Sequence, residues 1–240
     1  MPTVRTSSEI AHSDAVREMF SGIAGRYDLL NHLLSLNIDR RWRRAVAREL
    51  QDILARPEAI VLDVACGTGD LSIELAASAK ADVIGTDFCR PMLALADRKI
   101  AEIESRIPLV ESDAMSLPFA DESFDAVTIA FGLRNLSDTS DGLIELRRIL
   151  KPGGRLVVLE CSKPGIPGLD KLFNFYFSRI LPRIGGLISG SRGAYSYLPA
   201  SVARFPDQRK LEGMMKEVGF TAVSHKNLTG GVAALHFGSK

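Results

Sequence analysis

A glycine-containing turn that follows an apolar run offers the clearest chemistry in this sequence. Residues 61–70 are VLDVACGTGD, where Gly67 and Gly69 let the backbone approach a ligand and the helix that follows offers free N–H donors. The GxGxxG pattern of dinucleotide-binding turns is absent, and Asp70 directly after the turn would repel a pyrophosphate. We therefore expect a ligand without phosphate here; the alternative is a tight strand-to-helix turn that binds nothing.

Two further carboxylates stand where predicted strands end. Asp87 ends the run 83–86, 20 residues after Gly67, and a carboxylate at this spacing can accept hydrogen bonds from both hydroxyls of a ribose. Asp113 follows the run 107–110 and can accept from the exocyclic amine of an adenine, while Ala114 leaves room beside the ring. A solvated aspartate at a strand end is the alternative for each, but the pairing of Asp87 with the glycine turn favours a binding site.

Strand-length and helix-length segments alternate between residues 57 and 162, which predicts a parallel, doubly wound α/β sheet. One helix is opened by Pro91, and another covers 138–150 before a KPGG turn at 151–154. The chain ends with a helix over 207–218 and two strand-like runs around Thr229-Gly230-Gly231, which predict a terminal antiparallel hairpin. The predicted strands are 60–65, 83–86, 107–110, 124–130, 155–161, 221–227 and 232–237.

The first 56 residues have helical periodicity. An apolar stripe runs from Val16 to Ile23, Ser13 and Asp14 are the expected caps, and Gly25–His32 is a polar and aromatic join before a second stripe that starts at Trp42. We expect one domain with four parts: a helical N-terminal segment (1–56), a cofactor-binding half (57–162), a substrate cap (163–206), and the last helix and hairpin (207–240).

The composition is that of an ordinary globular protein. The chain has 240 residues, a formal net charge of +1 and 46% hydrophobic residues, so a nucleic-acid-binding protein is not expected, and the arginine-rich segment 39–44 is interpreted as a solvated helix face. No uncharged apolar run reaches the roughly 18 residues of a membrane span, and the first residues lack the apolar core of a signal peptide. The three cysteines are far apart, which fits a cytoplasmic protein without a disulfide framework or a cysteine-based zinc site.

Several motifs together resemble class I S-adenosylmethionine-dependent methyltransferases. They are DVACGTGD, the acid Asp87, SDAMSLPF, DESFD and LKPGGRLVVLE. FGLRN at 131–135 and YxYLPxS from Tyr195 resemble, more specifically, the C-methyltransferases of quinone biosynthesis that act on demethylmenaquinol and related polyprenyl benzoquinols. The match covers nearly the whole chain. It departs at Ala65, where many methyltransferases have the first glycine of the turn, and at Ala130, where some have a serine.

The resemblance implies a Rossmann-like, doubly wound, mostly parallel sheet with an antiparallel C-terminal hairpin and an N-terminal helical lid. It also implies S-adenosylmethionine as the methyl donor, with no metal. Thr68 and the backbone of Gly67 and Gly69 would hold its methionine end, Asp87 its ribose, and Asp113 with Ala114 its adenine. An acidic lip of Asp63, Asp70, Asp87 and Asp113 would suit the positive sulfonium.

The expected reaction is carbon methylation of demethylmenaquinol to menaquinol. The alternatives left open are a polyprenyl methoxy-benzoquinol of ubiquinone biosynthesis, or both quinols, another aromatic or sterol-like lipid, and a non-catalytic cofactor- or lipid-binding partner. Ionising a phenol at neutral pH costs about 4 kcal/mol, and Arg134 is the candidate that stabilises the phenolate, unless it is a structural arginine paired with a carboxylate. The candidate orienting groups, for each of which packing is the simpler role, are Tyr27, Asn31, His32, Asn135, Tyr195 and Tyr197.

Residues 163–210 carry the strongest charge asymmetry, with eight basic and two acidic residues. Within it, segment 169–198 alternates apolar residues with Lys171, Arg179, Arg183 and Arg192. Since a polyprenyl quinol is nearly insoluble in water, we expect a cytoplasmic protein that touches an anionic membrane surface through this segment. A cap that only covers the active site is the alternative.

Overall fold

The computed structural model of the protein describes residues 6–77, 79–162, 164 and 192–240, without the side chains of residues 30, 34 and 192–196. The expected membrane-contact segment 169–198 and most of the expected cap 163–206 therefore lie outside the described residues. In the part of the chain that is described, no helix combines the length and the apolar character needed to cross a bilayer.

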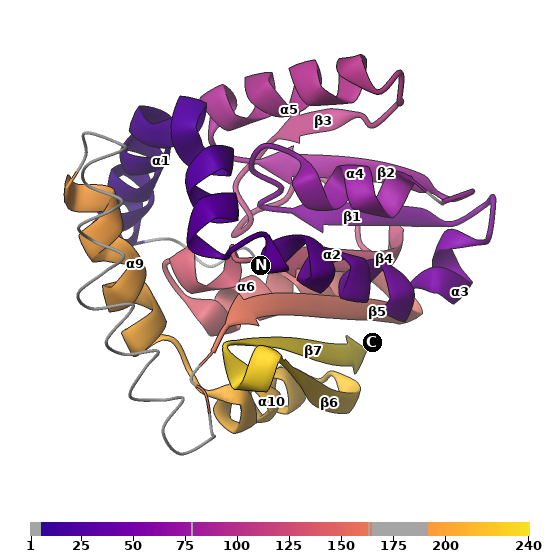
Figure 1. Ribbon diagram of the computed structural model, residues 1–240. Helices are drawn as coiled ribbons and strands as arrows, with labels where there is room; N and C mark the ends of the chain where they lie inside the picture. The colour runs from indigo at the N-terminus through magenta and orange to yellow at the C-terminus, as the bar shows by residue number, and fades with distance from the viewer. Residues whose placement is uncertain (1–5, 78, 163, 165–191) are drawn as a thin grey trace.

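Seven strands form one mixed sheet in the order β3-β2-β1-β4-β5-β7-β6 (Figure 1). The first five are parallel, and β7 runs antiparallel to both β5 and β6, which confirms the doubly wound sheet with a C-terminal antiparallel hairpin. The strand order reverses between β1 and β4, and ligands of such sheets bind where it reverses, at the carboxyl ends. The strands are β1 (Ile60–Val64), β2 (Asp82–Asp87), β3 (Leu109–Glu111), β4 (Phe124–Ala130), β5 (Leu150–Cys161), β6 (Thr221–Leu228) and β7 (Ala233–Ser239).

Helices cover both faces of the sheet because successive strand residues point to opposite sides. Val61 packs in the apolar cluster under α2, α4 and α5, whereas its neighbour Leu62 packs in the cluster under α6 and α10 (Figure 1). The helices are α2 (Ile38–Glu49), α3 (Gln51–Leu54), α4 (Asp70–Ala76), α5 (Arg90–Glu102), α6 (Thr139–Ile149) and α10 (Gln208–Glu217).

Helix α1 (Ser7–Leu34) begins earlier and extends further than predicted. Thr6 caps it: its hydroxyl oxygen accepts from the Glu9 N–H at 3.3 Å, and the Glu9 carboxylate accepts from the Thr6 N–H at 2.6 Å. The prediction that Ser13 and Asp14 cap the helix is wrong, since the capping-box pattern lies upstream at TSSE. The join predicted at Gly25–His32 is also helical, since α1 continues through it to Leu34.

The remaining boundaries follow local signals closely. Pro91 lies in the first turn of α5, Asp138 caps α6 and Asp207 caps α10. The turn predicted at 151–154 falls within β5, where Gly153 has a φ of +76° and its N–H donates to the carbonyl of Lys240 at 3.0 Å. Helix α9 (Arg192–Arg204) packs beside α1 where the parallel strands end (Figure 1).

Candidate active site

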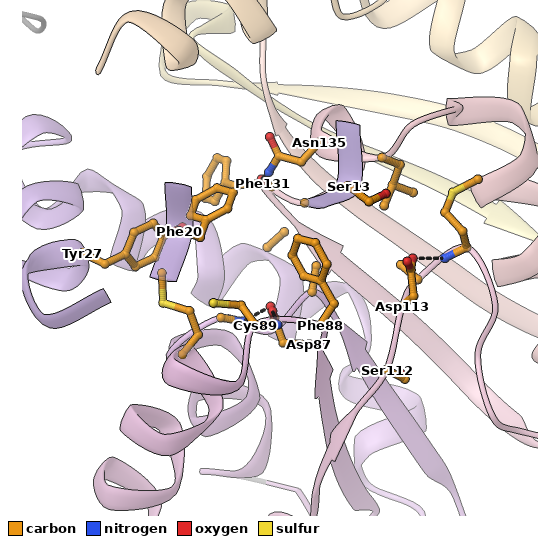
Figure 2. Close-up of a pocket in the computed structure, with 18 residues that line it drawn as sticks. Ser13, Phe20, Tyr27, Asp87, Phe88, Cys89, Ser112, Asp113, Phe131 and Asn135 are labelled. Atoms are coloured by element: carbon orange, nitrogen blue, oxygen red, sulfur yellow. Dashed lines mark hydrogen bonds between the residues drawn. The ribbon is translucent and has the colours of Figure 1, made fainter. Parts of the chain in front are cut away.

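A hollow opens at the carboxyl ends of β1 to β4, beside α1 (Figure 2). It encloses about 680 Å³ of empty space, and this figure includes space that is open to solvent. The segments that leave the four strands form one side of it, and Ser13, Phe20 and Tyr27 of α1 form another. Figure 2 shows Phe20, Tyr27 and Phe131 toward one end of the hollow and Asp113 toward the other.

The glycine turn after β1 needs unusual backbone angles. Gly67 and Gly69 have φ values of +56° and +82°, which favour glycine, and Ala65 adopts +52° although it carries a Cβ. Gly132, after β4, faces Ala65, and a Cβ there would lie 2.6 Å from the Ala65 Cβ. Ala65, which stands where many methyltransferases have a glycine, therefore adopts a strained backbone conformation, and its methyl group packs against Gly132.

Asp87 lies at the end of β2 with its carboxylate facing the hollow. Its side-chain oxygens accept from the backbone N–H groups of Gly67 and Cys89, each at 2.8 Å, and the residue is 6% exposed. Burial raises the pKa of Asp87, while these N–H groups work in the opposite direction. A carboxylate has about four acceptor sites, so this one can accept two more hydrogen bonds, as the ribose interpretation requires.

Asp113 and Ala114 also line the hollow, as the sequence analysis expected for an adenine site. Asp113 accepts from the Met115 N–H at 2.9 Å, drawn as a dashed line in Figure 2, and this bond orients its carboxylate. Ala114 is 8% exposed and packs in the core below.

Thr68 and Gly69, which the resemblance assigns to the cofactor, do not line the hollow, whereas Gly67 does. The Thr68 side chain is buried, and its hydroxyl donates to Asp28 of α1 at 2.5 Å. Gly69 begins α4, and a Cβ there would come within 3.1 Å of the Ala96 Cβ in α5. In the structure these two residues thus join the turn to α1 and α5, and their role toward a cofactor stays a prediction.

An ionic cluster ties the turn to α1, α2 and α5. Lys99 of α5 pairs with Asp28 at 2.9 Å and with Asp70, and the Arg43 guanidinium pairs with Asp70 at 2.7 Å and with Asp39 at 2.5 Å. Burial opposes ionisation of Asp70, but these two cations hold its pKa below the usual value. The negative charge of Asp70 is therefore compensated by the neighbouring Arg43 and Lys99 side chains.

His32 completes this cluster. Its Nδ1 lies 2.8 Å from Asp39 and its Nε2 lies 3.6 Å from Asp70. These three side chains come close enough together to hold a metal ion. No spacing in the sequence indicates this cluster, because its residues come from three different helices. The Arg43 guanidinium already contacts both carboxylates, so a positive charge is present among them.

Asp63 is buried inside the sheet and does not line the hollow. Its carboxylate accepts from the hydroxyls of Ser72 at 2.6 Å and Thr128 at 2.8 Å, and burial raises its pKa to about 6. The expected acidic lip of four aspartates is therefore wrong: Asp87 and Asp113 face the hollow, whereas Asp63 and Asp70 bond to other side chains. Strand-end position alone could not separate them.

Arg134 lies in a short 3₁₀ turn after β4 and is 8% exposed. It pairs with the buried carboxylate of Glu160 at 2.8 Å and donates to the Phe131 carbonyl at 2.6 Å. Burial works against its charged form, yet Glu160 raises the pKa of the guanidinium above its usual value. This is the geometry of the structural alternative, and Arg134 does not line the hollow. Its catalytic role stays a prediction.

Aromatic and amide groups form the wall nearest α1. The rings of Phe20 and Tyr27 meet edge to face at 5.9 Å, and burial raises the pKa of the Tyr27 phenol. The Asn135 amide accepts from the Tyr197 hydroxyl at 3.2 Å. The sequence predicted Phe20 only as part of the apolar stripe of the first helix, and it predicted no role for Phe88 in the site. Ser13, Phe20 and Tyr27 are spaced seven residues apart, which places them on one face of a helix. This spacing could have indicated that all three line the same site.

Comparisons with known proteins find relatives that match nearly the whole chain. The demethylmenaquinone methyltransferase of Thermus thermophilus is 50% identical over 223 residues, which cover 92% of this chain and 100% of that protein. The ubiquinone/menaquinone biosynthesis C-methyltransferase UbiE of Geobacter sp. (strain M21) is 46% identical over 231 residues, covering 95% and 97%.

The fold is similar to that of a SAM-dependent methyltransferase of Thermotoga maritima, with a TM-score of 0.67 and 19% identity over 93% of this chain and 98% of that one. The model of the family described as the ubiE/COQ5 methyltransferase family matches residues 8–240. This chain therefore belongs to the ubiE/COQ5 methyltransferase family.

Proposed function

We propose that the protein is an S-adenosylmethionine-dependent C-methyltransferase that converts demethylmenaquinol to menaquinol. The observation that carries this proposal is the charge of the hollow: its described lining contains two carboxylates, Asp87 and Asp113, and no lysine or arginine. Such a lining favours a cationic ligand over a phosphorylated one. Relatives named demethylmenaquinone methyltransferase support the substrate.

The residues present fit the methyl donor. Asp87 has two acceptor sites left for ribose hydroxyls, Asp113 is oriented by the Met115 N–H, and Ala114 leaves space for a flat ring. When bound, S-adenosylmethionine supplies a methyl group activated by a positively charged sulfur. The aromatic ring of Tyr27 would add to the attraction for this cation.

The wall nearest α1 suits an aromatic quinol. Phe20, Phe131 and Leu136 offer apolar contacts that exclude water, and Asn135 and Tyr27 offer polar groups at which a quinol oxygen can be oriented. The Arg134 guanidinium carbon lies 6.0 Å from the centroid of the Phe131 ring, and in this proposal it favours an ionised oxygen in the hollow by the part of its charge that the paired Glu160 carboxylate leaves uncompensated. Holding the ring carbon in line with the methyl group contributes the larger share, roughly 7–11 kcal/mol. In this proposal α1 acts as the lid.

The direct test supplies methyl-labelled S-adenosylmethionine with demethylmenaquinol, or with a polyprenyl methoxy-benzoquinol, and follows label in the quinol. We expect transfer to demethylmenaquinol, unchanged by a metal chelator. A cofactor- or lipid-binding partner would retain the label and transfer none. Label on the benzoquinol alone would move the activity to ubiquinone biosynthesis, and label on both would make it dual, as the name of the Geobacter relative states for that protein.

A second test follows the quinones of cells that lack the protein. Accumulated demethylmenaquinone would support the proposed substrate, and an unchanged quinone profile would contradict it. Because the prenyl tail of this substrate resides in a bilayer, we further propose that the protein works in peripheral contact with a membrane.

A further inference from the structure

Three large apolar side chains are exposed together where α1 turns into α2. Leu29, Leu33 and Leu36 are 61%, 45% and 76% exposed. The other exposed large apolar side chains among the described residues stand singly in separate segments, which is ordinary for a protein surface. They are Ile10, Ile103 and Ile144. Three of these six exposed apolar side chains therefore lie within the eight residues 29–36.

The backbone keeps the three leucines together and outward. Leu29 and Leu33 lie one helical turn apart on the same face of α1. The Leu36 N–H donates to the Leu33 carbonyl at 3.2 Å, so the chain folds back over the end of the helix. Leu36 has a φ of +53°, a conformation that disfavours a side chain of this size. The turn thus holds its most exposed leucine at the tip.

Positive charge borders these leucines. Residues 26–48 contain six arginines and two aspartates, and both aspartates are paired, Asp28 with Lys99 and Asp39 with Arg43. Arg40 and Arg41, in the first turn of α2, are exposed. The result is an apolar patch with a basic border, the pattern of proteins that lie in the interface of an anionic bilayer.

We propose that this α1–α2 turn surface, made of Leu29, Leu33, Leu36, Arg40 and Arg41, docks on an anionic lipid bilayer. The inference rests on the proposed function, because a polyprenyl quinol resides in a bilayer. Helix α1 also lines the hollow through Tyr27, so docking brings the hollow to the membrane that holds the substrate. A second copy of the chain fits this surface less well, since a two-fold contact would bring like charges together.

The test is co-sedimentation of the full chain with vesicles of phosphatidylglycerol and phosphatidylcholine, or of phosphatidylcholine alone. We expect binding to the anionic vesicles that weakens as salt rises. Leu33→Ser with Leu36→Ser, and separately Arg40→Glu with Arg41→Glu, are each expected to lower the partition coefficient about tenfold or more. The matched controls, Ile103→Ser with Ile144→Ser and Arg209→Glu with Lys210→Glu, change exposed residues elsewhere and are expected to bind like the unchanged protein.

A protein that stays in the supernatant at low salt, or leucine variants that bind as well as the controls, would overturn the docking surface. So would leucine variants that only dissociate a dimer, seen by sedimentation velocity, because the surface would then join two copies. Methyl transfer to a short-chain quinol without vesicles tests the proposed function separately: the leucine variants are expected to match the unchanged protein there. If no variant transfers a methyl group, the proposed function fails, while the vesicle comparison still decides the docking surface.

Discussion

Two groups of carboxylates surround the glycine turn and differ in their bonding partners. Asp87 and Asp113 line the hollow and accept hydrogen bonds from backbone N–H groups. Asp28, Asp39 and Asp70 lie on the other side of the turn and pair with Lys99 and Arg43. Backbone N–H groups orient a carboxylate and leave its formal charge in place, whereas a cation cancels that charge.

The difference assigns separate tasks to chemically identical side chains. The hollow keeps a negative charge that a cationic ligand can use, and the ionic cluster joins four elements without attracting one. We therefore expect substitutions in the cluster to affect mainly the free energy of unfolding, and substitutions in the hollow to affect mainly ligand affinity. The predictions below test this division.

The largest effect is expected from Arg43→Met. Arg43 and Asp39 are 11% and 5% exposed, so the variant leaves Asp39 and Asp70 in a poorly hydrated place without this cation. Breaking a buried ion pair in this way costs about 3–5 kcal/mol, which urea denaturation measures. The neighbouring Arg44, 59% exposed and 3.8 Å from Glu74, is the control, since Arg44→Met is expected to cost less than about 1 kcal/mol. Similar losses from both variants would mean that solvent screens the cluster.

Asp63 belongs to neither group, and its bonding predicts a pH dependence. The folded pKa of about 6 lies above the ordinary 3.8, so the folded protein holds the proton more tightly and ionisation of Asp63 opposes folding. Stability present below pH 3.8 is lost as the pH rises through about 6, in total about 3 kcal/mol.

Asp63→Asn removes this dependence, since the Ser72 and Thr128 hydroxyls can rotate to suit an amide. Relative to that variant, the unchanged protein is expected to lose about 2 kcal/mol of unfolding free energy between about pH 4.5 and about pH 7.5. If the difference in unfolding free energy between the two proteins does not change with pH, the pKa of Asp63 is not raised by folding.

In the hollow, Asp87→Asn is expected to act on ligand affinity. The amide keeps the shape of the side chain but loses the charge that strengthens bonds to ribose hydroxyls and attracts a sulfonium. Its NH2 group also cannot accept one of the two hydrogen bonds that the Gly67 and Cys89 N–H groups donate to Asp87. We expect S-adenosylmethionine to bind more weakly by roughly 1.5–3 kcal/mol in calorimetric titration. Asp82→Asn is the matched control, because Asp82 is exposed at the opposite end of the same strand. Unchanged affinity in a folded Asp87→Asn protein would remove Asp87 from the site.

Arg134 lies between the two kinds of role, with a buried partner like those of the cluster and a position next to the hollow. Arg134→Lys keeps the charge but replaces the planar guanidinium, whose Nη1 donates to both the Glu160 carboxylate and the Phe131 carbonyl, with a shorter side chain that ends in a compact ammonium. If the charge acts on the quinol oxygen, kcat falls about tenfold or more while the Kd for S-adenosylmethionine stays within about twofold. Arg147→Lys, which changes an arginine bonded to the Gly219 carbonyl, is the control. A normal kcat with lowered stability would make Arg134 purely structural.

The parts that the sequence predicted correctly depend on local signals. Strand alternation, the first-turn Pro91 and the caps Asp138 and Asp207 each involve residues a few positions apart. The prediction of a join after the first stripe was wrong because Gly25 and the polar residues after it are typical of a helix end, yet Gly25 has no positive φ, and the helix continues through it.

The partners of the carboxylates were not predictable in this way. Asp70 meets an arginine 27 positions away, and Asp28 meets a lysine 71 positions away. No local pattern marks such pairs, so the sequence did not distinguish the four aspartates of the expected acidic lip. The places of Asp87, Asp113 and Ala114 in the hollow followed from the strand ends, whereas the division of the aspartates into two groups, and the side of the hollow formed by α1, depend on how the helices pack.

The smallest effect is expected at Ala65, which connects β1 to the turn that both groups border. Its φ of +52° is unfavourable for alanine by about 1–2 kcal/mol, and glycine removes this penalty. Glycine also makes the unfolded chain more flexible, which offsets about 0.4–1 kcal/mol. We therefore expect Ala65→Gly to raise the free energy of unfolding by up to about 1.6 kcal/mol, with S-adenosylmethionine affinity unchanged within about twofold. Ala94→Gly, on the exposed side of helix α5, is the control with the opposite sign, because glycine inside a helix costs about 1 kcal/mol. A loss of stability in both variants would mean that the Ala65 methyl group, through its contact with Gly132, contributes more than its backbone strain removes.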